Sequence, residues 1–404
     1  MQCGDRTHAI ERSSCIPDGN ASDAANYPPG AIMKIMLYSQ HVLGIGHFFR
    51  SMEIAKALKP HQVLFVEGGD PLPGFVPPDH VKRLVLPPLM MDADFKSMET
   101  RRGSLEEVKR ERSDALLKAF AEFAPDVLVT ELFPFGRKQF RFELMPLLEE
   151  IRKRNGRPKV ACSLRDILVE KTDQAAYEQR VLDILNGCYD LLLIHSDPLL
   201  TRLDETFERI RDIAPPVFYT GFVVREAPPR SGNPDGKVIL ASTGGGKVGT
   251  DLLSAAIEAV QGMPEANVRL RVFVGPFMEE SERRRLDALA SRNPRTSLEA
   301  FSSDFPAELA RADLSITMAG YNTCMDILGT GVRALVYPFS QNREQTLRAE
   351  RLEKLGVLRI LKSLDARDIS TEIHNALNTR PSSPAGSLDL NGASRTARII
   401  EDLF

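Results

Sequence analysis

The sequence contains no hydrophobic run that approaches the roughly 20 residues of a membrane-spanning helix, although 43% of its 404 residues are hydrophobic. Its five cysteines are scattered and include no Cys-x-x-Cys pair, which argues against a structural zinc site and favours a reducing compartment. The net charge is only −3, so no general basic field is available to hold nucleic acid. We therefore expect a globular cytoplasmic protein that does not bind nucleic acid.

With 404 residues, the chain is too long to fold around one ordinary hydrophobic core, so its length predicts two domains. Residues 1–32 show no periodicity and lack the apolar segment of a signal peptide, so we expect a disordered N-terminal extension. Residues 223–236 are dense in proline and glycine, which is typical of a linker. This linker would join an N-terminal domain, residues 33–222, to a C-terminal domain, residues 237–385. We expect the terminal helix within residues 386–404 to pack back on the first domain.

Short apolar runs alternate with helical patterns along both halves of the chain. These runs include Lys34–Ser39, Val63–Glu67, Asp126–Glu131, Lys237–Ser242 and Leu314–Met318. Strands that alternate with helices predict an α/β protein with doubly wound parallel sheets. Ligands of such sheets bind beyond the carboxyl ends of the strands. We therefore predict two Rossmann-like domains that face each other across a ligand-binding cleft.

A glycine loop, QHVLGIGH, follows the first predicted strand, and its backbone N–H groups can approach a phosphate closely. Gly44 and Gly46, with Glu67 further on, resemble part of a dinucleotide-binding fingerprint. Phe49, however, occupies the place of the third glycine and would obstruct close packing of helix on strand. His47 ends this loop directly after Gly46, where its pKa would suit general-base catalysis. A lone histidine is often structural, but this position favours the base.

Charged side chains end two further predicted strands. Glu131 is a second candidate for acid–base or hydroxyl-binding work, and the alternative is a helix-capping or salt-bridged glutamate. Arg165 and Asp166 end the next strand, and the alternative for them is a local ion pair, which contributes little if exposed. The aromatic and basic segment Phe133–Phe142 would touch an acceptor or a membrane surface, or would simply pack as the start of a helix. Ordinary packing is the interpretation we favour.

Three consecutive glycines, Gly244–Gly246, separate a predicted strand from a predicted helix. The amides of such a loop can wrap a diphosphate at the N-terminus of the helix. The loop does not have the Walker A pattern, so it does not indicate chemistry on a magnesium-bound triphosphate. A plain tight turn is the alternative, but such a turn rarely needs three glycines.

The stretch Asp313–Gly356 predicts a strand, a turn (AGYN), a helix, a second strand, and a polar loop (SQNREQ) that leads into a second helix. Asn322 and Asp326 lie four residues apart on the first of these helices and share a face. A carboxylate there can bind the two vicinal hydroxyls of a ribose, while Glu344 and Gln345 can contact another polyol. In the alternative interpretation, Asp326 and Glu344 only complement helix dipoles.

The runs TELFPFGR (Thr130–Arg137) and EQTLRAERLEKLG (Glu344–Gly356) resemble those of GT-B glycosyltransferases of family 28. This is the family of the MurG-type N-acetylglucosaminyltransferases of peptidoglycan synthesis, and the runs are closer still to a bacterial branch of predicted glycosyltransferases. The resemblance extends over almost all of the sequence from Met33 and is strongest between Ser242 and Gly356.

The resemblance implies three groups of donor contacts: with the diphosphate, with the nucleoside and with the sugar. In that order, the implied residues are Gly244, Gly245, Gly246 and Arg225; Phe301, Ser302, Gly320 and Asp326; and Glu344 and Gln345. Asn322 joins the expected donor residues because it shares a helix face with Asp326. Asp326 stands where the family usually has a ribose-binding glutamate. On the acceptor side we expect Gly44, Gly46, Arg165 and Asp166.

The activity that the resemblance implies is transfer of a hexosyl-type sugar from a UDP-sugar, or another nucleoside-diphosphate donor, to a hydroxyl group of a carbohydrate or lipid-linked acceptor. His47, or in second place Glu131, would be the general base, with no metal and no cofactor besides the donor. Peripheral contact with the inner face of the membrane would suit a lipid-linked acceptor.

Three alternatives remain open at this point. The Gly-x-Gly-His-x-x-Arg pattern also resembles the loop of GT-B UDP-sugar hydrolases, in which the histidine activates water. A nicotinamide dehydrogenase would use Gly44, Gly46 and Glu67. A nucleotide-sugar sensor would bind the donor without turning it over.

Overall fold

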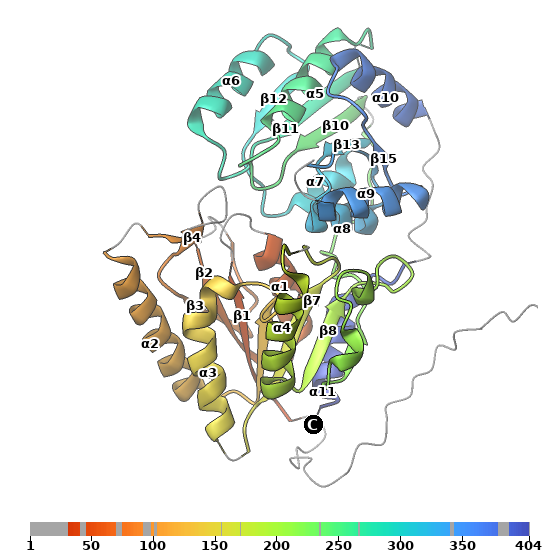
Figure 1. Ribbon diagram of the computed structural model, residues 1–404. Helices are drawn as coiled ribbons and strands as arrows, with labels where there is room; N and C mark the ends of the chain where they lie inside the picture. The colour runs from red at the N-terminus through yellow and green to blue at the C-terminus, as the bar shows by residue number, and fades with distance from the viewer. Residues whose placement is uncertain are drawn as a thin grey trace, which may run out of the picture.

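The structure is a computed structural model of the chain, and it describes residues 31–40, 46–69, 75–91, 98–100, 103–154, 156–169, 171–233, 236–265, 267–339, 343–378 and 388–403. In these ranges the chain forms two α/β lobes, one above the other in Figure 1. Each lobe is built on a parallel sheet, so the predicted pair of doubly wound domains is confirmed. Across these ranges, no helix combines the length and the apolar character that crossing a bilayer requires.

The N-terminal lobe has a seven-stranded sheet in the order β3-β2-β1-β6-β7-β8-β9. Its strands are β1 (Lys34–Gln40), β2 (Gln62–Gly68), β3 (Val81–Val85), β6 (Val127–Glu131), β7 (Lys159–Arg165), β8 (Leu191–His195) and β9 (Val217–Tyr219). Its helices are α1 (Gly46–Ala57), α2 (Leu105–Phe123), α3 (Arg141–Lys153) and α4 (Gln174–Cys188), with short 3-10 turns η1 (Lys138–Phe140), η2 (Leu203–Glu205) and η3 (Ile210–Asp212). A separate antiparallel pair joins β4 (Met90–Met91) to β5 (Met98–Glu99).

The C-terminal lobe has a six-stranded sheet in the order β12-β11-β10-β13-β14-β15. Its strands are β10 (Lys237–Ser242), β11 (Val268–Phe273), β12 (Thr296–Glu299), β13 (Leu314–Thr317), β14 (Arg333–Val336) and β15 (Arg359–Ile360). Its helices are α5 (Thr250–Gly262), α6 (Glu280–Ala290), α7 (Phe305–Arg311), α8 (Tyr321–Thr330), α9 (Arg343–Lys354) and α10 (Ala366–Asn378). The last helix of the chain is α11 (Gly392–Glu401).

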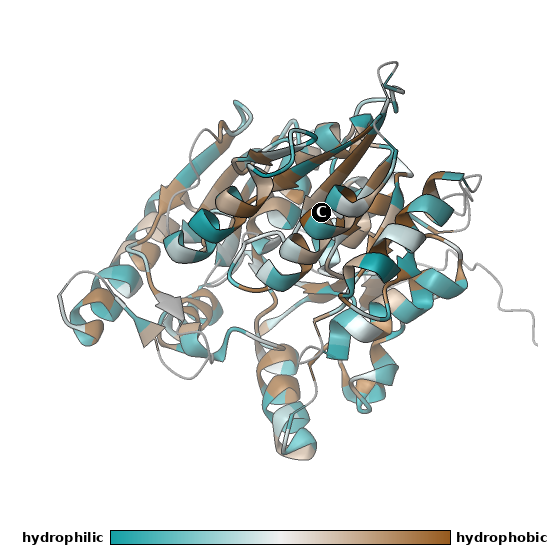
Figure 2. Cartoon of the chain, turned by 90° about the horizontal axis from the view of Figure 1, so that it is seen from above, coloured by the Kyte–Doolittle hydropathy of each residue, from teal (hydrophilic) through white to brown (hydrophobic). Residues whose placement is uncertain are grey.

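Both sheets are apolar on each face because helices cover both faces. Every residue of β6 and β8 is buried, as expected for central strands of a parallel sheet. Figure 2 shows the same division, with brown, hydrophobic strands inside and teal positions on the outer helices. A surface helix instead buries one stripe of residues that lie three or four positions apart. In α2 the stripe consists of Val108, Arg112, Leu116 and Phe120.

The end of the chain returns to the N-terminal lobe. Helix α11 packs against α1, and its Ile400 joins the core beneath β1 (Figure 1). His61 Nε2 lies 3.1 Å from Glu401 Oε1 at this contact. Val223, just after the N-terminal sheet, forms an antiparallel bridge with Asn391, just before α11. The chain after β9 and the chain before α11 therefore lie side by side at this bridge.

The first turns of two helices include residues that the sequence predicts as part of a turn (AGYN) or of a loop (SQNREQ). Tyr321 and Asn322 belong to α8, and α9 begins at Arg343, so Glu344 and Gln345 are helical. First-turn residues leave backbone N–H groups without helical partners, and polar side chains are common there. Such polar residues resemble a loop in sequence.

Three of the four aromatic rings of the segment 133–142 are not available to a membrane surface. Phe133, Phe135 and Phe140 are each at most 2% exposed and belong to the core of the N-terminal lobe. These three rings also line a cavity, so their burial excludes contact with a membrane surface, whereas contact with an acceptor stays a prediction. Arg137 of the same segment lines this cavity as well.

Candidate active site

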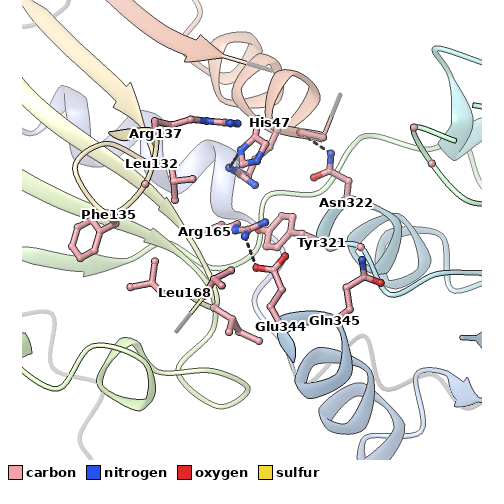
Figure 3. A pocket seen from close by; sticks show the side chains of 18 of the residues that line it. His47, Leu132, Phe135, Arg137, Arg165, Leu168, Tyr321, Asn322, Glu344 and Gln345 are labelled. Atoms are coloured by element: carbon pink, nitrogen blue, oxygen red, sulfur yellow. Dashed lines mark hydrogen bonds and ion pairs between the residues drawn. The ribbon is translucent and has the colours of Figure 1, made fainter. Parts of the chain in front are cut away.

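A cavity of about 1190 Å³ lies between the lobes and is lined by residues of both. The N-terminal lobe contributes the start of α1 and the segments that follow β6 and β7. The C-terminal lobe contributes the glycine loop after β10 and the first turns of α8 and α9. All these segments lie beyond the carboxyl ends of parallel strands, where ligands of open α/β sheets bind. Figure 3 shows side chains from both lobes pointing into this space.

His47 and Glu131 form a hydrogen-bonded pair at the cavity wall. Nδ1 of His47 lies 2.7 Å from Oε1 of Glu131, which ends β6 and is fully buried. Arg50, one turn further along α1, also donates to this oxygen. Nη2 of Arg50 lies 3.2 Å from Nδ1 of His47, but an arginine can only donate, so the shorter contact and the carboxylate place the proton of the ring on Nδ1. Nε2 of His47 is then the unprotonated nitrogen of a residue that lines the cavity.

The surroundings keep His47 neutral and Glu131 charged. Burial lowers the pKa of His47 to about 3, and Arg137 and Arg50 oppose the raising effect of Glu131. Burial by itself would raise the pKa of Glu131, but His47 and the two arginines hold this pKa below its usual value. An imidazolium would be a third cation around one carboxylate, which explains the preference for the neutral ring. A neutral imidazole with a fixed tautomer is the form that can accept a proton.

The glycine loop faces the same cavity from the other lobe. Gly244 and Gly245 line it, whereas Gly246 does not. Gly246 has a φ of +86° and a Cβ there would lie 2.9 Å from the Cα of Gly275, so the loop packs directly on the backbone after β11. A Cβ at Gly275 would lie 2.3 Å from the carbonyl carbon of Gly245. Gly275 was not among the predicted residues, because no local sequence pattern indicates that these two glycine segments meet.

Asp326 and Arg225 contact each other. Nε of Arg225 donates to Oδ1 of Asp326 at 3.0 Å, and a second nitrogen donates to Oδ2. The guanidinium also lies 4.9 Å from the ring centroid of Phe49. Both ends of this pair line the cavity, so the residues predicted for ribose and for diphosphate lie together and bind each other. Phe49 packs towards Phe301 of the opposite lobe, with ring centroids 6.3 Å apart, instead of obstructing its own sheet.

Three predicted residues bridge the lobes at the edge of the cavity. Nδ2 of Asn322 donates to the backbone oxygen of Gly46 at 2.7 Å. Arg165 forms an ion pair with Glu344, visible in Figure 3, so its partner is in the other lobe and the alternative of a local Arg165–Asp166 pair is wrong. Gln345 also lines the cavity, and its Oε1 accepts from the backbone N–H of Phe339 at 3.2 Å.

Asp166 does not line the cavity. Its carboxylate is fully buried and accepts from Nε and Nη2 of Arg348 at 2.7 and 2.8 Å. Nη1 of Arg348 donates to the backbone oxygen of Ala319 at 3.0 Å, just before α8. The expectation that Asp166 contacts the acceptor is therefore corrected, because its oxygens are occupied by Arg348. In sequence Arg348 belongs to a strongly charged helix, and nothing there distinguishes a buried arginine from exposed ones.

The remaining predicted positions divide into three groups. Phe301, Ser302 and Gly320 line the cavity. Gly44 lies outside the described residues. Glu67 is 2% exposed, is bound to Nε of Arg83 at 2.5 Å and does not line the cavity, so the dehydrogenase interpretation loses its ribose-binding acid. Among the residues that the structure describes, no cluster of three His, Cys, Asp or Glu residues is arranged for a metal ion, and metal independence remains a prediction.

Comparison with known proteins identifies the C-terminal half. Residues 241–391 match the glycosyltransferase family 28 C-terminal domain. A curated relative from Paramagnetospirillum magneticum, the UDP-N-acetylglucosamine--N-acetylmuramyl-(pentapeptide) pyrophosphoryl-undecaprenol N-acetylglucosamine transferase, is 26% identical over 194 residues, or 45% of this chain. The match spans about half, 51%, of that relative's length.

Solved structures resemble the fold of the whole chain. MurG of Acinetobacter baumannii has a TM-score of 0.53 at 16% identity, covering 91% of this chain and 99% of MurG. A protein of Listeria monocytogenes assigned as a UDP-N-acetylglucosamine 2-epimerase has a TM-score of 0.61 at 16% identity, covering 92% of this chain and 95% of its own. Likeness at this identity shows the fold and not the reaction. The chain thus has a two-lobed GT-B fold, and its residues 241–391 match the glycosyltransferase family 28 C-terminal domain.

Proposed function

We propose that this protein is a glycosyltransferase that moves a sugar from a UDP-linked donor to a hydroxyl group held by the N-terminal lobe. The observation that carries the proposal is that one cavity has the His47–Glu131 pair on one wall and the Gly244–Gly245 loop on the opposite lobe. The family 28 domain on the loop side supports a nucleotide-sugar donor. The curated relative is named as a transferase that uses UDP-N-acetylglucosamine.

The reaction requires one proton transfer and one displacement at the sugar. Nε2 of His47 takes the proton of the acceptor hydroxyl while the hydroxyl oxygen attacks the anomeric carbon. The bond from that carbon to the diphosphate oxygen breaks, and UDP leaves with the electron pair. Glu131 accepts from Nδ1 of His47 and stabilises the imidazolium that forms, so its role is to position and support the base.

The leaving diphosphate needs positive partners that are in place before the reaction. Backbone N–H groups of Gly244 and Gly245 can supply them, because these residues line the cavity without side chains. Arg225 lines the same cavity and can move from Asp326 to a phosphate, which leaves Asp326 free for the ribose hydroxyls. Glu344 and Gln345, in the first turn of α9, are placed to contact the sugar.

Calorimetric titration with UDP and a panel of UDP-sugars tests the donor site. We expect UDP-sugars to bind the wild type and to bind Gln345→Ala at least about tenfold more weakly, because one or two hydrogen bonds to the sugar are lost. Gln261→Ala removes the same side chain from an exposed position on α5, outside the cavity, and should leave affinity unchanged. Equal affinity in all three proteins would place the donor elsewhere. Asp326→Ala is a less clean test, because it also removes the partner of Arg225.

Turnover tests the base and the class of reaction. We expect His47→Ala to lose turnover while it keeps its affinity for UDP, and EDTA to leave turnover of the wild type unchanged. Product analysis with a UDP-sugar alone, and then with added acceptors, separates transfer from hydrolysis. Free sugar formed at the same rate with and without acceptor would identify a hydrolase, and an intact donor under every condition would identify a sensor.

A further inference from the structure

Arg137 is a buried cation without hydrogen-bond partners for two of its nitrogens. Its side chain is only 10% exposed, and Nε and Nη2 are buried without a hydrogen bond. The nearest anion is Glu131, whose Oε2 lies 3.8 Å from Nε, beyond hydrogen-bond distance. Arg137 lines the cavity, and Figure 3 shows its side chain extending towards His47. Burying a guanidinium whose nitrogens lack hydrogen-bond partners costs folding free energy, unless another group supplies the missing partners.

The charges around Arg137 do not balance within the protein. Glu131 is already bound by Arg50, and Arg165 is paired with Glu344. Burial and the nearby cations, Arg165 and Arg50, lower the pKa of Arg137 against the raising effect of Glu131. One carboxylate, that of Glu131, thus faces two arginines, and the positive charge of Arg137 is left without a matching negative charge.

The same wall of the cavity is basic over a wider area. The basic residues that the N-terminal lobe contributes to it, apart from Arg50, are Arg137, Lys138, Arg141, Arg165, Lys171 and Arg180. The acidic residue that this lobe contributes to the lining is Asp173, whose side chain caps α4 by accepting from the N–H of Ala176. Partial burial, Lys138 and Arg165 lower the pKa of Lys171, as expected where cations crowd together. An anion that enters this part of the cavity would meet complementary charge.

We propose that Arg137 binds an anionic group, a phosphate ester or a carboxylate, of the substrate that the N-terminal lobe holds beside His47. This inference rests on the proposed transfer reaction and adds the chemical class of its acceptor. The planar guanidinium suits either group, because both offer oxygens in a geometry that an arginine can bind with two nitrogens. Apolar side chains of the same wall, including Leu132, Ile167 and Leu168, would contact the uncharged part of the acceptor.

An anion at Arg137 would also improve the base. His47 has a low pKa partly because Arg137 and Arg50 repel an added proton, with Glu131 acting in the opposite direction. A bound anion would offset the charge of Arg137 and make His47 a stronger base when the acceptor is present. Binding and proton transfer would thus be coupled through one side chain.

Anion binding can be measured on the full-length protein saturated with UDP, so that the donor loop is not available to the probe. The melting temperature is followed against sodium phosphate and, separately, sodium acetate, at an ionic strength held constant with sodium chloride. We expect a saturable rise beyond the effect of chloride in the wild type. In Arg137→Gln the apparent Kd should be at least about tenfold weaker. A response to phosphate alone indicates a phosphate-bearing acceptor, and a response to acetate indicates a carboxylate.

Arg211→Gln is the matched control, because it removes one exposed positive charge from the same lobe outside the cavity and should behave as the wild type. Arg137→Lys keeps the charge but not the planar fork, and serves if Arg137→Gln does not fold. Equal anion affinity in the wild type and the Arg137 variants, or no effect beyond chloride, would overturn the inference. Failure of the donor proposal is seen separately, as absence of UDP binding in calorimetry.

Discussion

Asp166 and Arg348 lie 182 residues apart in sequence and form a fully buried, two-bond ion pair between the lobes. Both side chains are 0% exposed, so neither has water as an alternative partner. A buried pair of this kind does not necessarily stabilise a protein more than apolar packing would, but loss of one partner is severe. The lobes therefore depend on each other at a buried ion pair that lies outside the cavity lining.

Asp166→Asn should lower the free energy of unfolding by about 3–5 kcal/mol, because it leaves the charge of Arg348 buried without a counter-charge. Chemical denaturation measures the change. Asp212→Asn breaks an exposed pair with Arg209 and should cost at most about 1 kcal/mol. Similar losses in the two variants would mean that the Asp166–Arg348 pair is not buried in solution.

Glu131→Gln should lower kcat by about a hundredfold or more, within the range of general acid–base catalysis. The amide no longer fixes the proton on Nδ1 of His47 and no longer stabilises an imidazolium. Affinity for UDP should be unchanged, since Glu131 is not among the cavity-lining residues of the donor lobe. The melting temperature must be checked beside kcat, because Arg50 also loses its anion. A variant that is folded and fully active would remove Glu131 from the mechanism.

Stability should fall as the pH is lowered from about 6.5 towards 3. Burial lowers the pKa of His195 to about 3, with a further lowering by Arg50 against the effect of Glu131. Its ring lies between Ser163 Oγ at 2.7 Å and Thr220 Oγ1 at 2.9 Å. An unfolded histidine binds a proton near its ordinary pKa of 6.5 and the folded one does not, so the unfolded state binds more protons in this window.

Urea unfolding at a series of pH values measures this dependence. His195→Gln should show a flatter decline below pH 6.5 than the wild type, because one of the groups that titrates only on unfolding is gone. An identical slope in both proteins would contradict a neutral, buried His195. His47 contributes to the decline in the same direction, since its folded pKa is also low.

Gly275→Ala should weaken UDP binding by at least about tenfold. The new Cβ would lie 2.3 Å from the backbone of Gly245 and 2.4 Å from the oxygen of Gly244, so the loop must move. Calorimetry with UDP measures the loss. Gly262→Ala is the control, because a Cβ at the end of α5 meets nothing within 4 Å. If both variants bind UDP as the wild type does, the loop after β10 does not hold the diphosphate.

Most of the strands could be predicted from sequence because a strand covered on both faces is a short apolar run. β1, β6 and β10 begin and end within one residue or so of the predicted runs. The starts of helices were harder to predict from the sequence. The first turn of α9 resembled a loop, because its polar residues suit the free N–H groups of a helix N-terminus and do not continue an apolar helical stripe.

The candidate site, like the fold, could be predicted only in part from the sequence. His47 and Glu131 could be proposed as candidates because His47 follows one strand and Glu131 ends another, and the carboxyl ends of parallel strands share one edge of a sheet. Their direct contact, 84 residues apart, could not, because side-chain partners across strands leave no local pattern. For the same reason the sequence did not show that Asp166 is held by Arg348 or that Nε and Nη2 of Arg137 lack hydrogen-bond partners.

The amino-acid sequence by itself determined the two parallel sheets, their glycine loops and the family of the C-terminal domain, because these follow from local apolar runs, turn residues and contiguous motifs. The tertiary structure decided which polar groups are available for chemistry. Asp166 is bound across the lobes and Glu67 is bound to Arg83, while His47 and Arg137 face the cavity. Buried polar groups take their partners from whatever the fold packs against them, and those partners come from distant segments, so the sequence alone does not show which charged side chains a ligand can reach.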